Sequence, residues 1–166
     1  GIFAYEYNGY WKDVGTLSSY WEANMELIDI IPVLNLYEEF WKIYTKADIL
    51  PPQYIASTAY VEKSIIGDGC EIAGHVVNSV IGSGVTIEEG CEVRDSIIMN
   101  NTKVGAGTKI EKAIISEDTT IGANCSLGVG DEAPNVLKPN VYNSGLVTIG
   151  DHAVVPDGVT IGKNTC

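Results

Sequence analysis

Few side chains in this sequence have a type suited to catalysis or metal binding. The chain has two histidines, His75 and His152, and each could act as a general base because imidazole titrates near neutral pH. It also has four cysteines, Cys70, Cys91, Cys125 and Cys166. No Cys-x-x-Cys pair and no zinc-type spacing of cysteine and histidine occurs, so the sequence does not predict a zinc site. What these residues can do depends on the elements that position them.

Acidic side chains dominate the charge of the chain. Its 166 residues carry 22 Asp and Glu against 10 Lys and Arg, which gives a net charge of −12. Arg94 is the single arginine and no basic cluster occurs, so nucleic acid and anionic membranes are not expected partners. No apolar run reaches the roughly 20 residues of a membrane span, and no signal segment leads the sequence. A composition that is 45% hydrophobic is that of an ordinary globular protein.

Two segments of the chain differ in composition. Eleven of the 14 aromatic residues lie within residues 1–44, whereas 15 of the 18 glycines lie from Gly67 onward. Segments so different rarely share one architecture. We therefore expect two structural units, residues 1–50 and residues 51–166.

Residues 51–166 repeat with a period of about six. Aliphatic residues recur at Ile55, Val61, Ile66, Ile72, Ile81, Ile87, Val93, Ile98, Val104, Ile110, Ile115, Ile121, Leu127, Ile149, Val155 and Ile161. The segments VEKSII, VVNSVI, VRDSII and IEKAII form one motif repeated at intervals of 15, 17 and 17 residues. Two six-residue sides and one five-residue side close a 17-residue coil with three faces.

This repeat predicts an all-β-dominated fold, a parallel β-helix of hexapeptide repeats. The left-handed form is expected from hexapeptide-repeat proteins in general, because periodicity alone does not fix the hand. A β-sandwich would instead show alternation with a period of two.

The register of the repeat makes two further predictions. The fourth position after each aliphatic residue is expected to point into the core, and it holds Cys70, Cys91, Cys125, Ile97 and Ile114 among others. The three cysteines are therefore expected to be buried free thiols in a reducing, cytoplasmic setting, with Cys166 exposed. Residues 128–148, which contain two prolines and three glycines, are expected to leave the β-helix as a loop. Such a loop either covers a partner surface or is a plain surface excursion.

Residues 1–50 show a different pattern. Alternating aromatic residues in Ile2–Tyr7 predict a strand, and Asn8-Gly9 predicts a turn. Helical spacing predicts an amphipathic helix over residues 16–30, and its inner face would hold Leu17, Tyr20, Trp21, Asn24, Met25 and Ile28. Thr16 or Ser19 could cap that helix, with Ser19 and Glu22 spaced as a capping box. Residues 36–44 predict a second short helix or a turn.

One strand and one helix bury too little surface to fold alone. Residues 1–50 are therefore expected to be the tail, strand plus helix, of a larger α/β domain. The whole chain is then a fragment of a longer protein.

Specific motifs resemble those of bacterial glucose-1-phosphate adenylyltransferase, also called ADP-glucose pyrophosphorylase. They are YWKDVGT at residues 10–16, SYWEANMELI at 19–28, NLYEEFWKIYT at 35–45, GVGDEAPN at 128–135 and VTIGDHAVVPDGVTIG at 147–162. The WxDVGT element alone is shared with other sugar-1-phosphate nucleotidyltransferases, whereas its combination with the aromatic linker is much more specific. That family joins a nucleotidyltransferase domain to a C-terminal left-handed β-helix, so residues 1–50 would end the first and residues 51–166 would form the second.

The resemblance implies a reaction of ATP with α-D-glucose 1-phosphate that gives ADP-glucose and pyrophosphate for glycogen synthesis. It also implies that Asp13, the Asp of WxDVGT, is one of two carboxylates that bind Mg²⁺. From the residues alone, Asp13 could instead cap the turn or the following helix. The other substrate-binding residues of the family would precede Gly1, so the fragment is expected to be inactive by itself and to serve regulation and oligomerisation. The family further implies a homotetramer, or a heterotetramer with a regulatory paralogue.

Two alternative functions remain open at this stage. A hexapeptide-repeat acyltransferase would use a histidine such as His75 or His152, although both positions favour surface corners of the repeat. A non-catalytic regulatory paralogue would use the β-helix only as an assembly scaffold, and the retained Asp13 argues against it.

Overall fold

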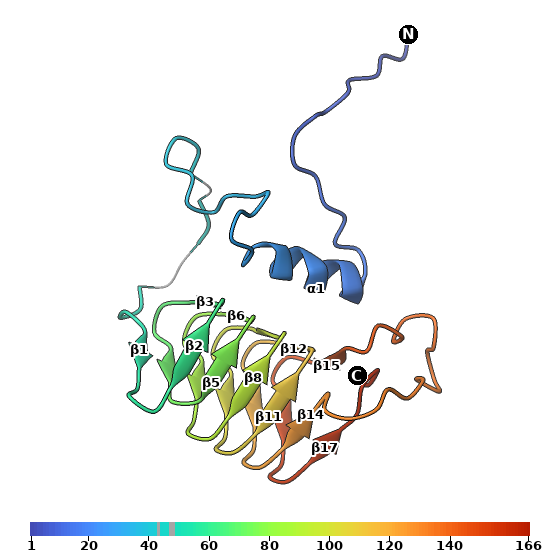
Figure 1. The fold of residues 1–166 in the computed structure, drawn as a ribbon. Helices are drawn as coiled ribbons and strands as arrows, with labels where there is room; N and C mark the ends of the chain where they lie inside the picture. Colours follow the sequence, from blue (N-terminus) through green and yellow to red (C-terminus); the bar gives the residue numbers. More distant parts are fainter. Residues whose placement is uncertain (43, 47–48) are drawn as a thin grey trace.

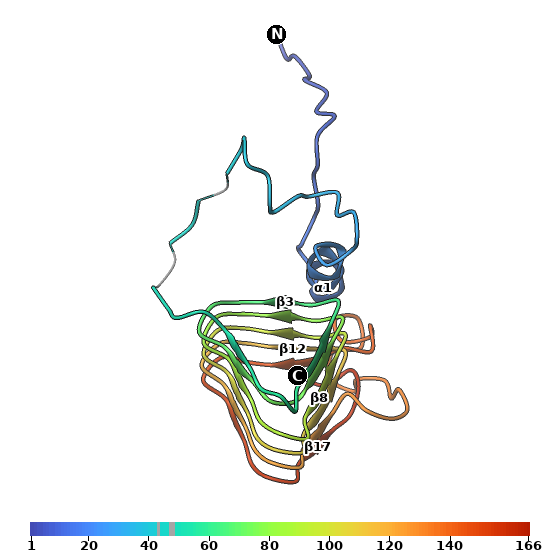
Figure 2. The ribbon, with the colours of Figure 1, turned by 60° about the vertical axis from the view of Figure 1, so that its left-hand side comes forward.

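The computed structural model describes residues 1–42, 44–46 and 49–166. Residues 54–161 form a parallel β-helix whose coils stack along one axis (Figure 1). Viewed more nearly along that axis, the coils outline a triangle with short strands on its sides (Figure 2). Three parallel sheets form the three faces, as the repeat predicted.

The described residues form 17 strands of two or three residues each. Sheet A contains β1 (Tyr54–Ile55), β4 (Glu71–Ile72), β7 (Thr86–Ile87), β10 (Lys103–Val104), β13 (Thr120–Ile121) and β16 (Val154–Val155). Sheet B contains β2 (Tyr60–Glu62), β5 (His75–Val77), β8 (Glu92–Arg94), β11 (Lys109–Glu111), β14 (Ser126–Leu127) and β17 (Thr160–Ile161). Sheet C contains β3 (Ile65–Ile66), β6 (Val80–Ile81), β9 (Ile97–Ile98), β12 (Ala113–Ile115) and β15 (Val147–Ile149).

Neighbouring coils align in register. Asn78 and Asp95 occupy equivalent corners of successive coils and lie 17 residues apart in the chain. Equivalent positions are separated by 15 residues along the chain in one shorter coil, between Ser64 and Ser79. This separation rises to 34 residues across the inserted loop. That loop runs between β14 and β15 over residues 128–146. It ends two residues before the predicted limit of 148, because β15 begins at Val147.

Columns of aliphatic side chains fill the interior of the prism. Ile81, Ile98 and Ile115 occupy equivalent positions in three successive coils of sheet C, and each is at most 1% exposed. β-Branched residues suit this core because they pack well on pleated strands. Similar columns of valine, isoleucine and leucine complete the core.

Two isoleucines differ from the expected register. Ile97 and Ile114 face outward, because each precedes an inward-facing residue in its strand and side chains alternate across a strand. The side of the coil that leads into sheet C is one residue shorter, so its inward small residue comes one position earlier, as Ser96 shows. Both outward isoleucines are nevertheless buried, since they form a second apolar cluster with the helix.

The core cysteines have the predicted environment. All four cysteines are free, with Cys70, Cys91 and Cys125 buried and Cys166 exposed. The Cys91 thiol donates a hydrogen bond to the carbonyl of Gly105 at 3.1 Å, as the Thr108 hydroxyl does to that of Gly122 at 2.8 Å. Burial raises the pKa of the Cys70 and Cys91 thiols, which keeps them protonated.

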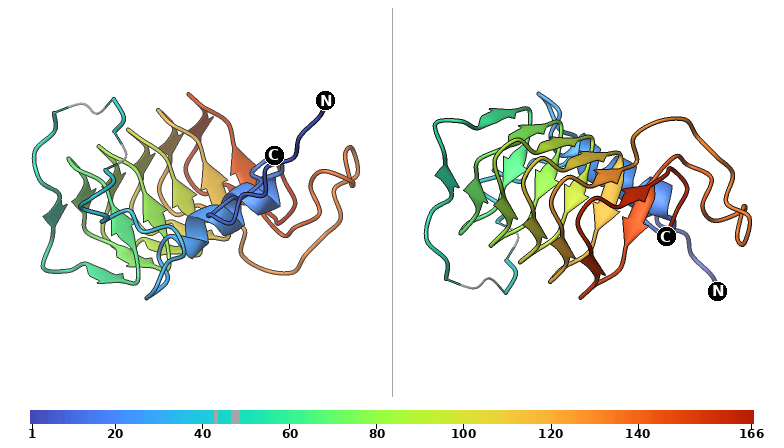
Figure 3. Two further views of the ribbon diagram at one scale, coloured as in Figure 1. Left: turned by 90° about the horizontal axis from the view of Figure 1, so that it is seen from above. Right: turned by 90° about the horizontal axis from the view of Figure 1, so that it is seen from below.

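Among the described residues there is one helix, α1 (Leu17–Glu26), and it lies over sheet C (Figures 2 and 3). Thr16 is its N-cap: the Thr16 hydroxyl accepts from the backbone N–H of Ser19, whose side chain accepts from the backbone N–H of Thr16. Because Ser19 completes this box, it does not start a second one with Glu22. The helix ends at the C-cap Leu27, before the predicted limit of residue 30.

The segment before α1 differs from its prediction. Alternation predicted a strand at residues 2–7, but the described backbone forms none there, because no neighbouring strand lies beside it to complete a ladder. Figure 1 shows this segment leading away from the β-helix. Phe3 and Tyr5 are accordingly 93% and 89% exposed.

The linker after α1 bends at several points and has no helix in its described part; its turn at residues 36–37 lies within the segment predicted as a short helix or a turn. Its aromatic residues Phe40 and Trp41 are fully or largely exposed. Ile43, which belongs to the segment predicted as a short helix or turn, lies outside the described residues. Across residues 1–42, 44–46 and 49–166, no helix has the length and apolar character needed to cross a membrane.

Candidate functional site

Asp13 lies in a tight turn just before α1. Its carboxylate Oδ1 accepts a hydrogen bond from the backbone N–H of Gly15 at 2.8 Å, and Thr16 then caps the helix. The side chain is exposed to solvent. Asp13 therefore stabilises a turn, as one of the two interpretations predicted, and its role as a metal ligand stays a prediction.

The residue before Asp13 is also fixed to the helix. The Lys12 ammonium lies 2.6 Å from the Glu26 carboxylate, so residues 12–13 run alongside α1. This hydrogen bond raises the pKa of Lys12 above its ordinary value. The turn is thus held by the Asp13–Gly15 hydrogen bond and by the ion pair of Lys12 with Glu26, the last residue of α1.

Helix α1 contacts the β-helix through one face. Leu17, Tyr20, Trp21 and Met25 pack on the outward residues Ile97, Ile114 and Leu146, as the helical spacing predicted for the inner face. The indole Nε1 of Trp21 donates a hydrogen bond to the backbone carbonyl of Asp95 at 2.7 Å. Asp95 lies at the corner between sheets B and C, where its φ is 49°.

The next coil adds a cation to this contact. The Lys112 ammonium lies 5.7 Å from the centroid of the Trp21 ring and donates to the carbonyl of Ser144 at 2.6 Å. Ser144 belongs to the inserted loop, so Lys112 joins α1 to that loop.

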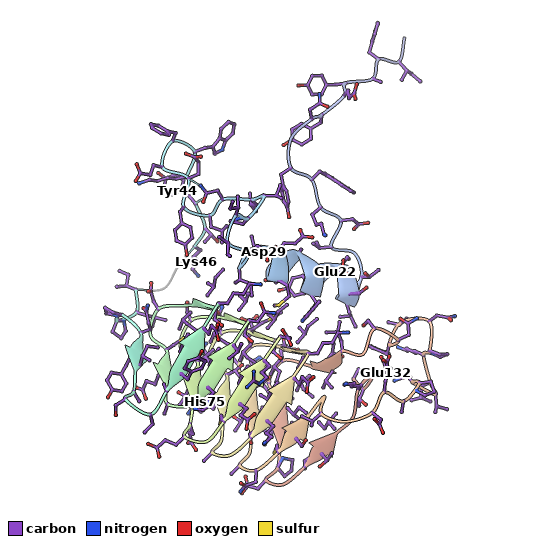
Figure 4. All side chains as sticks on the ribbon, viewed as in Figure 1. Glu22, Asp29, Tyr44, Lys46, His75 and Glu132 are labelled. Atoms are coloured by element: carbon purple, nitrogen blue, oxygen red, sulfur yellow. The ribbon has the colours of Figure 1, made fainter. Side chains whose placement is uncertain are left out.

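The inserted loop is fastened to the last coil by one buried amide. The Asn164 Oδ1 accepts from the N–H of Gly145 at 2.7 Å, and its Nδ2 donates to the carbonyl of Ala133 at 2.9 Å and to Glu132. Figure 4 shows Glu132 on the loop, beyond the end of the β-helix. The loop is therefore held at both of its halves.

A divalent metal needs more than Asp13 supplies. Within the described parts of the chain, no group of three or more His, Cys, Asp or Glu side chains is placed to hold a metal ion. A single exposed carboxylate does not make a Mg²⁺ site, which requires further oxygen ligands. The residues present do not by themselves form the metal site that the resemblance implied.

The two histidines lie apart from Asp13 and from each other. His75 is in β5 on the outer face of sheet B, where its ring meets that of Tyr60 edge-on with centroids 6.0 Å apart (Figure 4). His152 is an exposed corner residue with φ 55°, and its Nδ1 lies 3.9 Å from Asp118. Both are surface residues, as predicted, but only His152 lies at a corner of the repeat, since His75 lies within β5.

Three residues of this region were not singled out from the sequence: Asp95, Lys112 and Asn164. Helical spacing placed Trp21 on the inner face of α1 but could not pair it with a corner 74 residues away in the chain. The only available signal was that Asp95 and Lys112 fill the third position of the repeated six-residue motif, where a corner is expected.

Short parallel strands, aliphatic columns and a period of six define a hexapeptide-repeat protein built as a left-handed parallel β-helix. The family model described as GlmU-like, C-terminal hexapeptide matches residues 52–149, and the chain belongs to this family.

Several curated relatives match nearly the whole chain. It is 74% identical over 164 residues to a glucose-1-phosphate adenylyltransferase of Lachnospira eligens, a match that covers 99% of this chain and 39% of the relative. It is 49% identical over 163 residues to a glucose-1-phosphate adenylyltransferase of Acetivibrio thermocellus, covering 98% of this chain and 38% of the relative. The corresponding protein of Thermotoga maritima is 48% identical, with the same coverage. The chain thus spans less than two fifths of the length of these relatives.

Proposed function

We propose that this chain is the C-terminal part of an enzyme that makes ADP-glucose and pyrophosphate from ATP and α-D-glucose 1-phosphate for glycogen synthesis. The observation that carries the proposal is 74% identity to a glucose-1-phosphate adenylyltransferase over 99% of the chain. This match includes the segment before residue 52, which the hexapeptide family model does not cover. Residues 1–50 would then end the catalytic domain, and residues 51–166 would form the β-helix domain.

Asp13 is the proposed catalytic contribution of this chain. Transfer of a nucleotidyl group depends on positioning and on charge neutralisation at phosphate oxygens. A divalent ion such as Mg²⁺ would supply that neutralisation in the whole enzyme, with Asp13 as one of its ligands. The accessible carboxylate in a turn tied at Gly15 supports this role. The remaining ligands and the substrate contacts would come from the part of the enzyme outside this chain.

The activity test compares two proteins under the same conditions. The full-length protein that carries this sequence, given ATP, glucose 1-phosphate and Mg²⁺, is expected to release pyrophosphate and form ADP-glucose, whereas residues 1–166 alone are expected to form none. One carboxylate cannot organise the two substrates, which explains the second expectation. A coupled pyrophosphate assay with chromatography of the nucleotide product measures both. ADP-glucose formation by residues 1–166, or its absence from the folded full-length protein, would contradict the proposal.

The β-helix is proposed to serve regulation and assembly in the same enzyme, as a homotetramer or as a heterotetramer with a regulatory paralogue. Sheets A and B are flat faces that α1 does not cover, and among the described residues β1 is an edge strand of sheet A; such surfaces favour association. A cytoplasmic location is part of this proposal, supported by three buried free thiols.

Assembly is tested by sedimentation of both proteins. We expect the full-length protein to sediment as a tetramer and residues 1–166 to form oligomers as their concentration rises. If residues 1–166 remain monomeric at every concentration while the full-length protein is tetrameric, the β-helix does not drive assembly.

A further inference from the structure

We propose that Trp21 and Lys112 are positioning residues that fix the register of helix α1 along the β-helix, and that this register holds the turn carrying Asp13. The inference rests on the proposed function only in treating Asp13 as a working carboxylate. The mechanical part, in which two side chains hold a turn they do not touch, stands on the contacts within this chain.

Apolar packing by itself leaves the position of α1 ambiguous. The outward residues of sheet C repeat from coil to coil, with Val80, Ile97 and Ile114 aligned in β6, β9 and β12. Successive coils are spaced by about 4.8 Å, the separation of hydrogen-bonded strands. Apart from Leu146 of the inserted loop, an apolar helix face meets a similar surface after sliding by one coil toward Val80, because burial of apolar area is not directional. Some directional contact must therefore select one register.

The Trp21 hydrogen bond supplies such a contact. Its acceptor, the Asp95 carbonyl, belongs to a rigid corner: the Asp95 N–H donates to Val77 O at 3.2 Å, and its carboxylate accepts from the Asn78 amide. The indole N–H is a single donor with one direction. At 2.7 Å it ties the middle of α1 to a corner of the β-helix.

Lys112 distinguishes that coil from its neighbours. The corner residues of four successive coils are Lys63, Asn78, Asp95 and Lys112, all with φ between 44° and 49°. Of the two lysines, Lys112 is the one next to the inserted loop. Its ammonium donates to the Ser144 carbonyl at 2.6 Å and lies 5.7 Å from the centroid of the Trp21 ring. Slipping α1 by one coil toward Asn78 would bring the indole N–H to an equivalent corner carbonyl, but Asp95 would then take the place of Lys112 and the cation–π contact would be lost.

The position of α1 determines the position of Asp13, because few residues separate the two. Asp13 is three residues before the N-cap Thr16, and its carboxylate closes a turn onto Gly15. The Lys12–Glu26 ion pair ties the same segment to the far end of the helix. The turn and α1 therefore move as one unit, and a shift of α1 would displace the carboxylate.

Three variants of residues 1–166 test the mechanical part by hydrogen–deuterium exchange. Trp21→Phe keeps an aromatic ring but removes the donor, and Lys112→Met keeps the aliphatic length but removes the cation. Tyr20→Phe is the matched control, because Tyr20 lies in the same cluster and its hydroxyl takes part in no hydrogen bond among the described residues. We expect amide exchange in residues 13–26 to accelerate about fivefold in the first two variants and to stay unchanged in the control, with the β-helix core equally protected in all.

Lys112→Arg provides a rescue. Arginine keeps both the cation over the ring and a donor for the Ser144 carbonyl, so exchange is expected to return to the original rate. Equal exchange in Trp21→Phe, Lys112→Met and Tyr20→Phe would overturn the proposal.

The same variants in the full-length enzyme connect the register to function. Trp21→Phe and Lys112→Met are expected to raise the Mg²⁺ concentration for half-maximal activity about threefold or more, with an unchanged melting temperature. If exchange accelerates but the Mg²⁺ dependence does not move, the helix register is real and does not position Asp13. If the full-length protein forms no ADP-glucose at all, the proposed function fails while the exchange result still decides the mechanical part.

Discussion

Replacing Ile98 with alanine is expected to lower the free energy of unfolding of the β-helix by about 3 kcal/mol. Ile98 is fully buried and stacks between Ile81 and Ile115 in the neighbouring coils of sheet C. Removing three carbons there leaves a cavity that the flat, hydrogen-bonded coils on either side cannot collapse to fill. For a chain of this length, the melting temperature should fall by roughly 6–12 °C.

Thermal unfolding followed by circular dichroism measures this effect, and Val154→Ala is its control. Val154 lies in β16 with its side chain 73% exposed, so its truncation should change the melting temperature by about 1 °C or less. A drop of equal size in both variants would mean that burial in the prism is not what stabilises the coils.

The β-helix was predictable because its sequence constrains it at every turn. Each coil places an aliphatic residue at the same inward positions, so the repeat is recognisable even where a single coil departs from it. The error at Ile97 and Ile114 has a specific cause. A side shortened by one residue changes which positions face inward, and an aliphatic residue can be buried on either face of a sheet when a helix covers the outer one. One sequence does not reveal which sheet the helix covers.

The segment before residue 17 was less predictable for a different reason. A strand forms only beside another strand, so the alternation in Ile2–Tyr7 shows a tendency that this chain alone does not satisfy. The candidate site has the same limit. The resemblance indicated Asp13, whose role stays a prediction, and local spacing predicted its turn but left Thr16 and Ser19 open as the capping residue and placed the capping box one turn too late. The contacts of Trp21 with Asp95 and Lys112 join residues far apart in the sequence, and no local rule predicts them.

Asp13→Asn in the full-length enzyme is expected to reduce kcat at least about a hundredfold, because an amide is a weak ligand for a hard divalent cation and carries no charge. This substitution separates the two roles of the residue. Asparagine accepts the hydrogen bond from the Gly15 N–H as well as aspartate does, and it is an equally good residue for turns and caps. If Asp13 only stabilised the turn, Asp13→Asn would keep nearly full activity.

Two further variants complete this test. Asp13→Ala removes both the charge and the turn hydrogen bond, so it should match Asp13→Asn in kcat but show faster amide exchange at residues 13–16. Glu22→Gln removes an exposed carboxylate from α1, and the activity of this variant should change less than about twofold. Such a small change would exclude a general effect of net charge. An Asp13→Asn enzyme with undiminished kcat and unchanged Mg²⁺ dependence would show that the carboxylate is structural. The functional reason for fixing α1 on the β-helix would then have to lie elsewhere on the helix.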